Sequence, residues 1–316
     1  MDTKVLIGVE KLFRYYGHHL AVDAISFELA QGEVLGFLGP NGAGKSTTMQ
    51  MISGNLAPSA GRITLNGIDL LDRPKAAKAE IGYLPEQPPL YPDLTVDEYL
   101  AYCARLHRVS KVQRGRALDR AKQRCGLDDV GRRLIGNLSK GYQQRVGIAQ
   151  AILHNPAVVI LDEPTVGLDP NQIRDIRTLI RELGESHGII LSTHILPEVQ
   201  ATCSRVQIIH RGRLVFAESM QTLEQRLTGK SLILETARPL GGDILAQLPG
   251  VDGVDIIGTQ RARLHFQADN PAEQVAASVA AQGWGLVELA LDRQTLEQVF
   301  VELTCSEETA QHGEAA

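Results

Sequence analysis

A glycine-rich loop that follows an apolar run constrains this chain more than any other feature. Residues 39–47 read Gly-Pro-Asn-Gly-Ala-Gly-Lys-Ser-Thr, which fits the pattern G-x-x-x-x-G-K-[ST], and residues 34–38 before them are nearly all apolar. Glycines let backbone N–H groups curl around phosphate oxygens, and a helix that starts behind them adds the positive end of its dipole. An apolar strand, such a loop and a helix in succession predict an α/β fold with a buried, parallel sheet. The alternative is a glycine-rich turn that binds nothing.

Residue types in the loop match the needs of a bound triphosphate. Lys45 would bridge the β- and γ-phosphates, and the hydroxyl of Ser46 would reach a bound Mg²⁺. The residues that we predict to bind the cofactor in the loop and at the start of its helix are Gly39, Pro40, Asn41, Gly42, Ala43, Gly44, Lys45, Ser46, Thr47 and Thr48.

Two further apolar runs end in residues that can carry chemistry. Residues 157–161 are followed by Asp162 and Glu163, and residues 188–191 are followed by Ser192, Thr193 and His194. In open α/β sheets, ligands bind outside the carboxyl ends of the strands. We therefore expect these polar residues to meet at the glycine-rich loop.

The acidic pair suggests a division of roles. Behind a loop of this kind, the first acid, Asp162, would hold Mg²⁺ through water. Glu163 would point toward the γ-phosphate and polarise the attacking water as general base. His194 is predicted to contact the γ-phosphate because it ends the third strand. The alternatives are a solvated, inert acidic pair and a structural histidine.

The chain around these strands changes character twice. Residues 25–29 alternate between apolar and polar side chains, which predicts a strand with one solvated face, so the first 40 residues are interpreted as strands. A helical insertion is predicted over residues 88–150, with helical patterns at 95–106 and 117–125. Thr95 and Glu98 have the spacing of a capping box.

A second region begins near residue 220 and has its own pattern of elements. Strands are predicted at residues 231–235, 251–257, 262–266 and 285–291, and helices at 242–248 and 271–282. This βαββαβ order is that of a small ferredoxin-like α+β domain. A helix at 295–303 and a flexible tail from residue 306 follow, so the predicted domains are 1–220, 221–305 and 306–316. This second domain is interpreted as a packing or dimerisation module, with a regulatory ligand sensor as the alternative, and Trp284 as part of its core.

Composition excludes some classes of protein. With 316 residues and a formal net charge of −5, the chain has room for two domains and no general basic excess, which argues against a dedicated nucleic-acid binder. No apolar run reaches the ~18 to 20 residues that a membrane-spanning helix needs. At a membrane, another polypeptide would have to do the spanning. The four scattered cysteines are expected to be free thiols in a reducing cytoplasm.

Taken together, the motifs resemble the nucleotide-binding subunits of ABC transporters. The diagnostic segment is Leu138-Ser-Lys-Gly-Tyr-Gln-Gln-Arg145, which is similar to the LSGGQ signature of that family and lies between the loop and the acidic strand. Residues 83–87 match the Q-loop and residues 167–170 match the D-loop. The resemblance covers residues 1 to about 220, with six motifs in the order that the family shows.

The resemblance implies roles for five more residues. Gln87 would be a ligand of Mg²⁺ and take part in catalysis, and Tyr16 would stack on adenine, with Tyr15 as the alternative. Ser139 and Gly141 would face the γ-phosphate held by a partner subunit, and Asp169 would belong to the nucleotide site. One departure lies in the signature, where Lys140 and Tyr142 replace a Gly and a Gln.

A narrower group is also indicated. The LSKGY form of the signature, residues 169–173 and 192–199, and the ending Leu296-Glu-Gln-Val-Phe-Val-Glu-Leu303 resemble an ABC-2 type, gliding-motility-associated group of export ATPases.

The resemblance implies an ATPase with ATP and Mg²⁺ as cofactors, which works as a head-to-tail dimer. The chain holds one phosphate-binding loop and one signature, so a homodimer or a pair with a related ATPase is expected. ATP-driven dimerisation would power export through a separate ABC-2 type permease. The Q-loop stretch, residues 87–91, would contact that permease, and the subunit would lie on the cytoplasmic face of the membrane. The alternative is a soluble ABC-type ATPase that is not coupled to transport.

Overall fold

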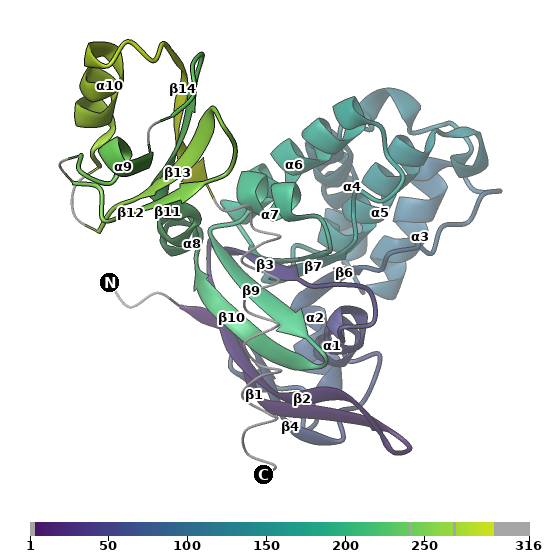
Figure 1. Ribbon diagram of the computed structural model, residues 1–316. Coiled ribbons are helices and arrows are strands. Elements are labelled where there is room, and N and C mark those ends of the chain that lie inside the picture. Colours follow the sequence, from purple (N-terminus) through teal and green to yellow (C-terminus); the bar gives the residue numbers. More distant parts are fainter. Residues whose placement is uncertain (1–3, 241, 249, 268–269, 294–316) are drawn as a thin grey trace. The chain divides into compact units, whose positions relative to one another are not determined.

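The computed structural model describes residues 4–240, 242–248, 250–267 and 270–293. The helix predicted at 295–303, the tail from residue 306 and Cys305 lie outside the described residues. The chain forms two compact units, residues 1–220 and 221–316, and each is described by itself (Figure 1).

The first unit begins with an antiparallel sheet in the strand order β2-β1-β4-β5. Its strands are β1 (Val5–Tyr16), β2 (His19–Ala30), β4 (Ala60–Leu65) and β5 (Ile68–Asp69). The predicted alternation in β2 is confirmed, because Ile25, Phe27 and Leu29 are buried whereas Ser26 and Glu28 are exposed. The predicted N-terminal β-subdomain is therefore present.

A second sheet carries the strands that were predicted to be buried. Its order is β10-β9-β3-β8-β7-β6, and every neighbouring pair is parallel except β10 and β9. The strands are β3 (Val34–Leu38), β6 (Ile81–Leu84), β7 (Val158–Asp162), β8 (Gly188–Thr193), β9 (Arg205–His210) and β10 (Arg213–Ser219). All residues of β3, β7 and β8 are buried, which confirms the prediction made from the three apolar runs.

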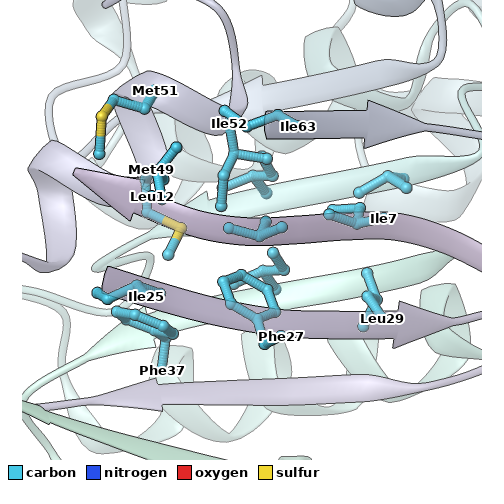
Figure 2. Close-up of a cluster of buried hydrophobic side chains, with 14 of the residues drawn as sticks. Ile7, Leu12, Ile25, Phe27, Leu29, Phe37, Met49, Met51, Ile52 and Ile63 are labelled. Carbon is cyan, nitrogen blue, oxygen red and sulfur yellow. The ribbon is translucent and has the colours of Figure 1, made fainter. Parts of the chain in front are cut away.

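Apolar side chains from both sheets and from helix α1 (Lys45–Ile52) form one core, which Figure 2 shows. Phe27 of β2 and Phe37 of β3 face each other with ring centroids 5.9 Å apart. Met49 and Met51 of α1 are fully buried in the same cluster. Each side chain of this size contributes about 1.5 to 3 kcal/mol when buried. The helix behind the glycine-rich loop is therefore fixed by its apolar face.

Helices fill the chain between β6 and β7. They are α3 (Val96–Leu106), α4 (Lys111–Cys125) and α5 (Lys140–Ile152). The capping box is confirmed: the Glu98 N–H donates to Thr95 Oγ1 at 3.3 Å, and the Thr95 N–H donates to Glu98 Oε2 at 2.9 Å. Helix α4 starts six residues earlier than predicted because Ser110 caps it, while the polar residues of its first turns hide the apolar period.

The remaining helices of this unit are α2 (Pro74–Ala79), α6 (Pro170–Gly184) and α7 (Leu196–Thr202), and α8 (Met220–Leu227) crosses the boundary between the units. Cys103, Cys125 and Cys203 are buried free thiols. No helix among the described residues is long and apolar enough to span a membrane.

The second unit contains a four-stranded antiparallel sheet in the order β12-β13-β11-β14. Its elements are β11 (Thr228–Thr236), α9 (Gly242–Leu245), β12 (Gly253–Ile256), β13 (Arg261–His265), α10 (Ala272–Ala281) and β14 (Leu286–Arg293). This is the predicted βαββαβ order, and Trp284 packs against the core as expected. Helix α9 is shorter than the predicted 242–248 because the chain continues in tight turns, with the Gln247 N–H on the Ile244 carbonyl.

Candidate nucleotide-binding site

The carboxyl ends of the buried strands open into a cavity of about 410 Å³. The predicted residues that line it are Tyr16, Asn41, Gly42, Gly44, Lys45, Ser46, Thr47, Glu163 and His194. Four further residues line the cavity although no sequence motif pointed to them: His19, Ala21, Glu86 and Val166. Segments that are far apart in the chain therefore meet at the glycine-rich loop.

The loop holds its shape through two glycines and Lys45. Gly42 and Gly44 have φ angles of 81° and 108°, in the region where residues with a Cβ are strained. A Cβ on Gly44 would also lie 2.7 Å from the Ala21 carbonyl oxygen. Lys45 Nζ donates to the carbonyls of Gly39 at 2.8 Å and Pro40 at 3.3 Å. The ammonium is therefore buried beneath the loop and aimed at its centre.

Some of the predicted residues support the cavity without lining it. The carbonyl oxygens of Gly39 and Pro40 accept hydrogen bonds from the Lys45 ammonium, and the Ala43 side chain is buried. The Thr48 side chain is fully buried, and its hydroxyl donates to the Gly44 carbonyl at 2.8 Å, so it closes the first turn of α1. Gln87 is exposed after β6, where Glu86 is the residue that lines the cavity.

Asp162 ends β7 and is 2% exposed. Burial raises the pKa of its carboxyl, while the hydroxyls of Ser192 and Ser46 oppose that shift. Its Oδ1 atom is buried and has no hydrogen-bond partner among the described residues. A carboxylate with an unpartnered oxygen beside a serine hydroxyl is the oxygen-rich donor set that Mg²⁺ prefers. Asp162 and Ser46 thus fit the predicted metal.

Glu163 is held at the centre of an ion-paired group. Its Oε1 lies 3.5 Å from Lys45 Nζ, and its Oε2 lies 2.9 Å from His194 Nδ1. The residue has a φ angle of 49°, and its N–H donates to the Ser192 carbonyl at 2.8 Å. A non-glycine residue in this region costs on the order of 1 to 3 kcal/mol and persists where its surroundings enforce it. The structure thus brings His194 to Glu163, a contact that the sequence did not predict.

Glu198, a buried acid next to the loops that follow β7 and β8, was also missed by the sequence analysis. Glu198 of α7 is 1% exposed and accepts hydrogen bonds from the hydroxyls of Thr193, at 2.9 Å, and Thr165. Thr193 precedes His194, and Thr165 lies two residues after Glu163, so Glu198 joins the two loops that carry the ion-paired group. The signal in the sequence is an acid inside the otherwise apolar run 195–199.

The two tyrosine candidates are placed differently. Tyr16 lines the cavity, and the guanidinium carbon of Arg14 lies 4.7 Å from the centre of its ring. Tyr15 is not among the lining residues, and its N–H donates to Ser59 Oγ at 3.1 Å. Consecutive residues of a strand face opposite sides, so only one of the pair can face the loop. The position of Tyr16 favours it as the stacking residue.

The signature residues lie apart from this cavity. Ser139 caps α5, and its Oγ accepts the Tyr142 N–H at 3.4 Å. Ser139 and Gly141 line a second cavity of about 220 Å³, and a Cβ on Gly141 would lie 2.6 Å from the Gln172 side chain. Asp169 caps α6 and accepts the N–H groups of Asn171 and Gln172, both at 3.0 Å. In a single chain, the loop and the signature therefore belong to separate cavities.

The parallel sheet, the loop with its buried lysine and the two acids behind it define a P-loop ATPase. The sequence model of the family described as "ABC transporter" matches residues 22–166. A Bacillus subtilis protein described as an uncharacterized ABC transporter ATP-binding protein, YxlF, is 32% identical over 94% of this chain and 99% of its own length. The chain therefore belongs to the family of ABC transporter ATP-binding proteins.

Other relatives have more specific descriptions. The linearmycin resistance ATP-binding protein LnrL of Bacillus subtilis is 30% identical over 95% of this chain and 98% of its own. The bacitracin transport ATP-binding protein BcrA of Bacillus licheniformis is 37% identical over 70% of this chain and 72% of its own. A solved ATP-binding subunit of an ABC transporter superposes with a TM-score of 0.63 at 33% identity, over 70% of this chain and 92% of that one.

These comparisons fix the general function. The chain is the ATP-binding, ATP-hydrolysing subunit of an ABC transporter, and the comparisons do not favour the alternative of an ATPase without transport. Members of this family act with transmembrane permeases.

Proposed function

We propose that this subunit drives export through an ABC-2 type permease, and that its ATP site is completed by the signature of a second ATPase subunit. The observation that carries the second point is the separation of the two cavities. Lys45 and Glu163 line one, whereas Ser139 and Gly141 line the other. Either a second copy of this chain or a related ATPase would supply the missing half.

Within the nucleotide site, each residue has a proposed role. Tyr16 stacks on adenine, and the loop N–H groups and Lys45 hold the phosphates, with Thr47 lining the same cavity. Mg²⁺ would be held by Ser46, Asp162 and Gln87, and it would neutralise charge on the phosphates. Glu163 is the general base for the attacking water, and His194 keeps the carboxylate in place through its Nδ1 contact.

Water activation depends on the protonation of Glu163. A carboxylate must be ionised to accept a proton, and in this structure the Glu163 carboxylate lies 3.5 Å from the Lys45 ammonium. When ATP enters, its phosphates become the natural partner of Lys45. Glu163 is then left with His194 as its polar neighbour, free to accept a proton from water.

The surface after the Q-loop is proposed as the contact with the permease. Tyr91 is 52% exposed, and its ring lies 5.9 Å from Tyr102 and 6.1 Å from Tyr99. Tyr99 is buried, and its hydroxyl donates to the Pro89 carbonyl at 3.1 Å. This connection fixes residues 87–91 against α3, so that movement of the helical insertion would reach a bound permease on the cytoplasmic face of the membrane.

Export, rather than import, is supported by the resemblance to the ABC-2 group and by two relatives. Their descriptions name linearmycin resistance and bacitracin transport. By analogy, this chain would power the removal of a compound from the cell. The chemical identity of that compound is not part of the proposal.

The test is an affinity capture of tagged Glu163→Gln from solubilised membranes with ATP and Mg²⁺, with Lys45→Ala as the matched control. We expect Glu163→Gln to retain ATP and to recover a multi-span permease, and Lys45→Ala to recover less of it. Recovery of soluble partners alone would contradict the proposal.

A further inference from the structure

The first unit contains a cavity that is larger than the nucleotide site. It has a volume of about 960 Å³ and lies between α2, the turn that joins α3 to α4, and the end of α5. Its lining includes Lys75, Lys78, Arg108, Arg116 and Arg120. No described Asp or Glu side chain is part of the lining. For a chain with a formal net charge of −5, this is a strong local excess of positive charge.

The spacing of these cations destabilises the helices on which they lie. Arg116 and Arg120 are four residues apart on α4, and Lys75 and Lys78 are three residues apart on α2. Like charges at these spacings are neighbours on one helix face and destabilise the helix. Both pairs face the same cavity, so the repulsion within each pair is added to that between them.

The five side chains are also unpaired within the described ranges, where none of them has an ion pair or a side-chain hydrogen bond. Elsewhere in this unit, Arg62, Lys122, Arg145, Arg205 and Arg213 are each paired with an Asp or Glu. Five cations without an acidic partner among the described residues are thus gathered at one concave place.

Two histidines line the same cavity and add no charge of their own near neutral pH. The rings of His107 and His154 are stacked with centroids 3.9 Å apart. His154 Nε2 donates to the Ile81 carbonyl at 3.0 Å. Burial and the neighbouring His107 lower the pKa of His154 to about 4, so the pair is neutral at pH 7. The positive charge of the cavity therefore comes from the lysines and arginines.

We propose that this cavity is a second ligand site, which binds an anion with two or more phosphate groups. Several negative charges within a volume of this size are typical of an oligophosphate or of a phosphate-bearing lipid headgroup. Guanidinium groups match phosphate oxygens in a two-pronged geometry, and lysines add point charges. A bound anion would contact α2 on one side and α4 on the other, and so join the helical insertion to the α/β part of the unit.

The direct test is calorimetric titration of sodium tripolyphosphate into full-length protein that carries Lys45→Ala, which weakens binding at the glycine-rich loop. The test variant adds Arg116→Glu and Arg120→Glu. The matched control adds Arg132→Glu and Arg133→Glu instead. Both arginines are exposed, lie near the start of α3 and do not line the cavity. We expect the test variant to bind more than about tenfold more weakly than the control, since each lost contact to a charged group has an effect of that size.

Lys75→Gln with Lys78→Gln removes charge from the other wall of the cavity without introducing acids. These lysines are exposed, and we expect a smaller loss of affinity in the same direction. Binding of ATP by the same cavity variants, measured with Lys45 intact, serves as the check on folding and is expected to stay unchanged. Equal affinity for tripolyphosphate in the cavity variants and the control, or no binding in the Lys45→Ala background, would overturn the proposal unless the vesicles described next are bound.

Vesicles distinguish the two sources of phosphate. Phosphatidylcholine vesicles with and without cardiolipin, whose headgroup carries two phosphate groups, are sedimented with wild-type protein, with the Arg116→Glu, Arg120→Glu variant and with the Arg132→Glu, Arg133→Glu control. Loss of sedimentation only in the cavity variant assigns the site to a lipid headgroup, and binding of tripolyphosphate without sedimentation assigns it to a soluble anion. A protein that binds neither lacks the proposed site.

Discussion

The nucleotide cavity and the signature cavity of this chain differ in how their polar groups are held. In the first, Lys45 and Glu163 are buried and contact each other, and His194 joins them. In the second, Ser139 is exposed and accepts only the Tyr142 N–H of the helix that it begins, and the ion pair between Arg145 and Asp175 is partly exposed. The first cavity is therefore organised by buried charges from distant segments, whereas the signature serine of the second is held by local helix capping.

This contrast separates the half of the ATP site that depends on the fold of the chain from the half that depends on a partner subunit. Buried charges must be paired, so their removal disturbs the chain that holds them. A capping serine can be lost at little cost to the fold, and the exposed side chain of Ser139 is accessible to another subunit. Substitutions in the two cavities should accordingly separate hydrolysis, binding and stability.

The largest effect is expected for Glu163→Gln. The amide keeps the size of the side chain but cannot take a proton from water, so hydrolysis should fall by about 10² to 10⁴. ATP should still bind, and the nucleotide should remain trapped in a closed dimer. Release of phosphate in a single-turnover assay measures the effect. Hydrolysis at the wild-type rate would show that Glu163 is not the base.

Glu198→Ala tests whether the buried acid holds the two loops of the nucleotide cavity. It leaves the hydroxyls of Thr165 and Thr193 without their acceptor, and we expect the free energy of unfolding to drop by about 2 to 4 kcal/mol. Urea denaturation followed by circular dichroism gives this value. Glu198→Gln, which keeps one acceptor oxygen, is the matched control and should lose less. Equal and negligible losses in both would disprove the role.

Lys45→Ala should weaken binding of ATP by about 10- to 100-fold, because charge-assisted contacts to the phosphates are lost. Calorimetry with ATP and Mg²⁺ measures the change. Lys111→Ala is a suitable control, since Lys111 is an exposed lysine outside both the nucleotide cavity and the signature. Undiminished affinity in Lys45→Ala would count against the assignment of the loop.

Tyr16→Ala should reduce affinity for ATP by about 1 to 3 kcal/mol, the range for a base stacked on an aromatic ring. Tyr15→Ala provides the comparison, because its side chain is exposed to the same extent but does not line the cavity. Titration of each variant with ATP distinguishes them. A larger loss in Tyr15→Ala would transfer the stacking role to that residue.

The smallest effect on the fold is expected for Ser139→Ala, which removes one helix cap worth about 0.5 to 2 kcal/mol. Ser110→Ala removes a cap with the same 3.4 Å hydrogen bond at the start of α4. The two variants should lose similar stability in urea denaturation. Only Ser139→Ala should also lose hydrolysis, and a similar loss in Ser110→Ala would remove the distinction between the two cavities.

The sequence was sufficient where a motif is short and local. Residues 39–47, the strand that ends in Asp162 and the capping box at Thr95 each carry their own signal, and the structure has them as predicted. The alternation of β2 and the βαββαβ order of the second unit were equally visible.

Contacts between distant segments could not be predicted in this way. Glu198 meets Thr165 across 33 residues, and His194 meets Glu163 across 31, and no local pattern specifies either pair. The choice of Glu86 over Gln87 as a lining residue depends on how the chain bends after β6. The basic cavity joins α2 with α4, two helices whose charges look like ordinary solvated faces when each is considered by itself.

The most direct test of the divided site is sedimentation velocity of Glu163→Gln with ATP and Mg²⁺, with and without the additional substitution Ser139→Arg. Ser110→Arg, at the other capping serine, is the control. We expect an ATP-dependent dimer for Glu163→Gln and for the Ser110 control, and a monomer that still binds ATP when Ser139 is replaced. A dimer of equal strength in the Ser139→Arg protein would contradict this expectation.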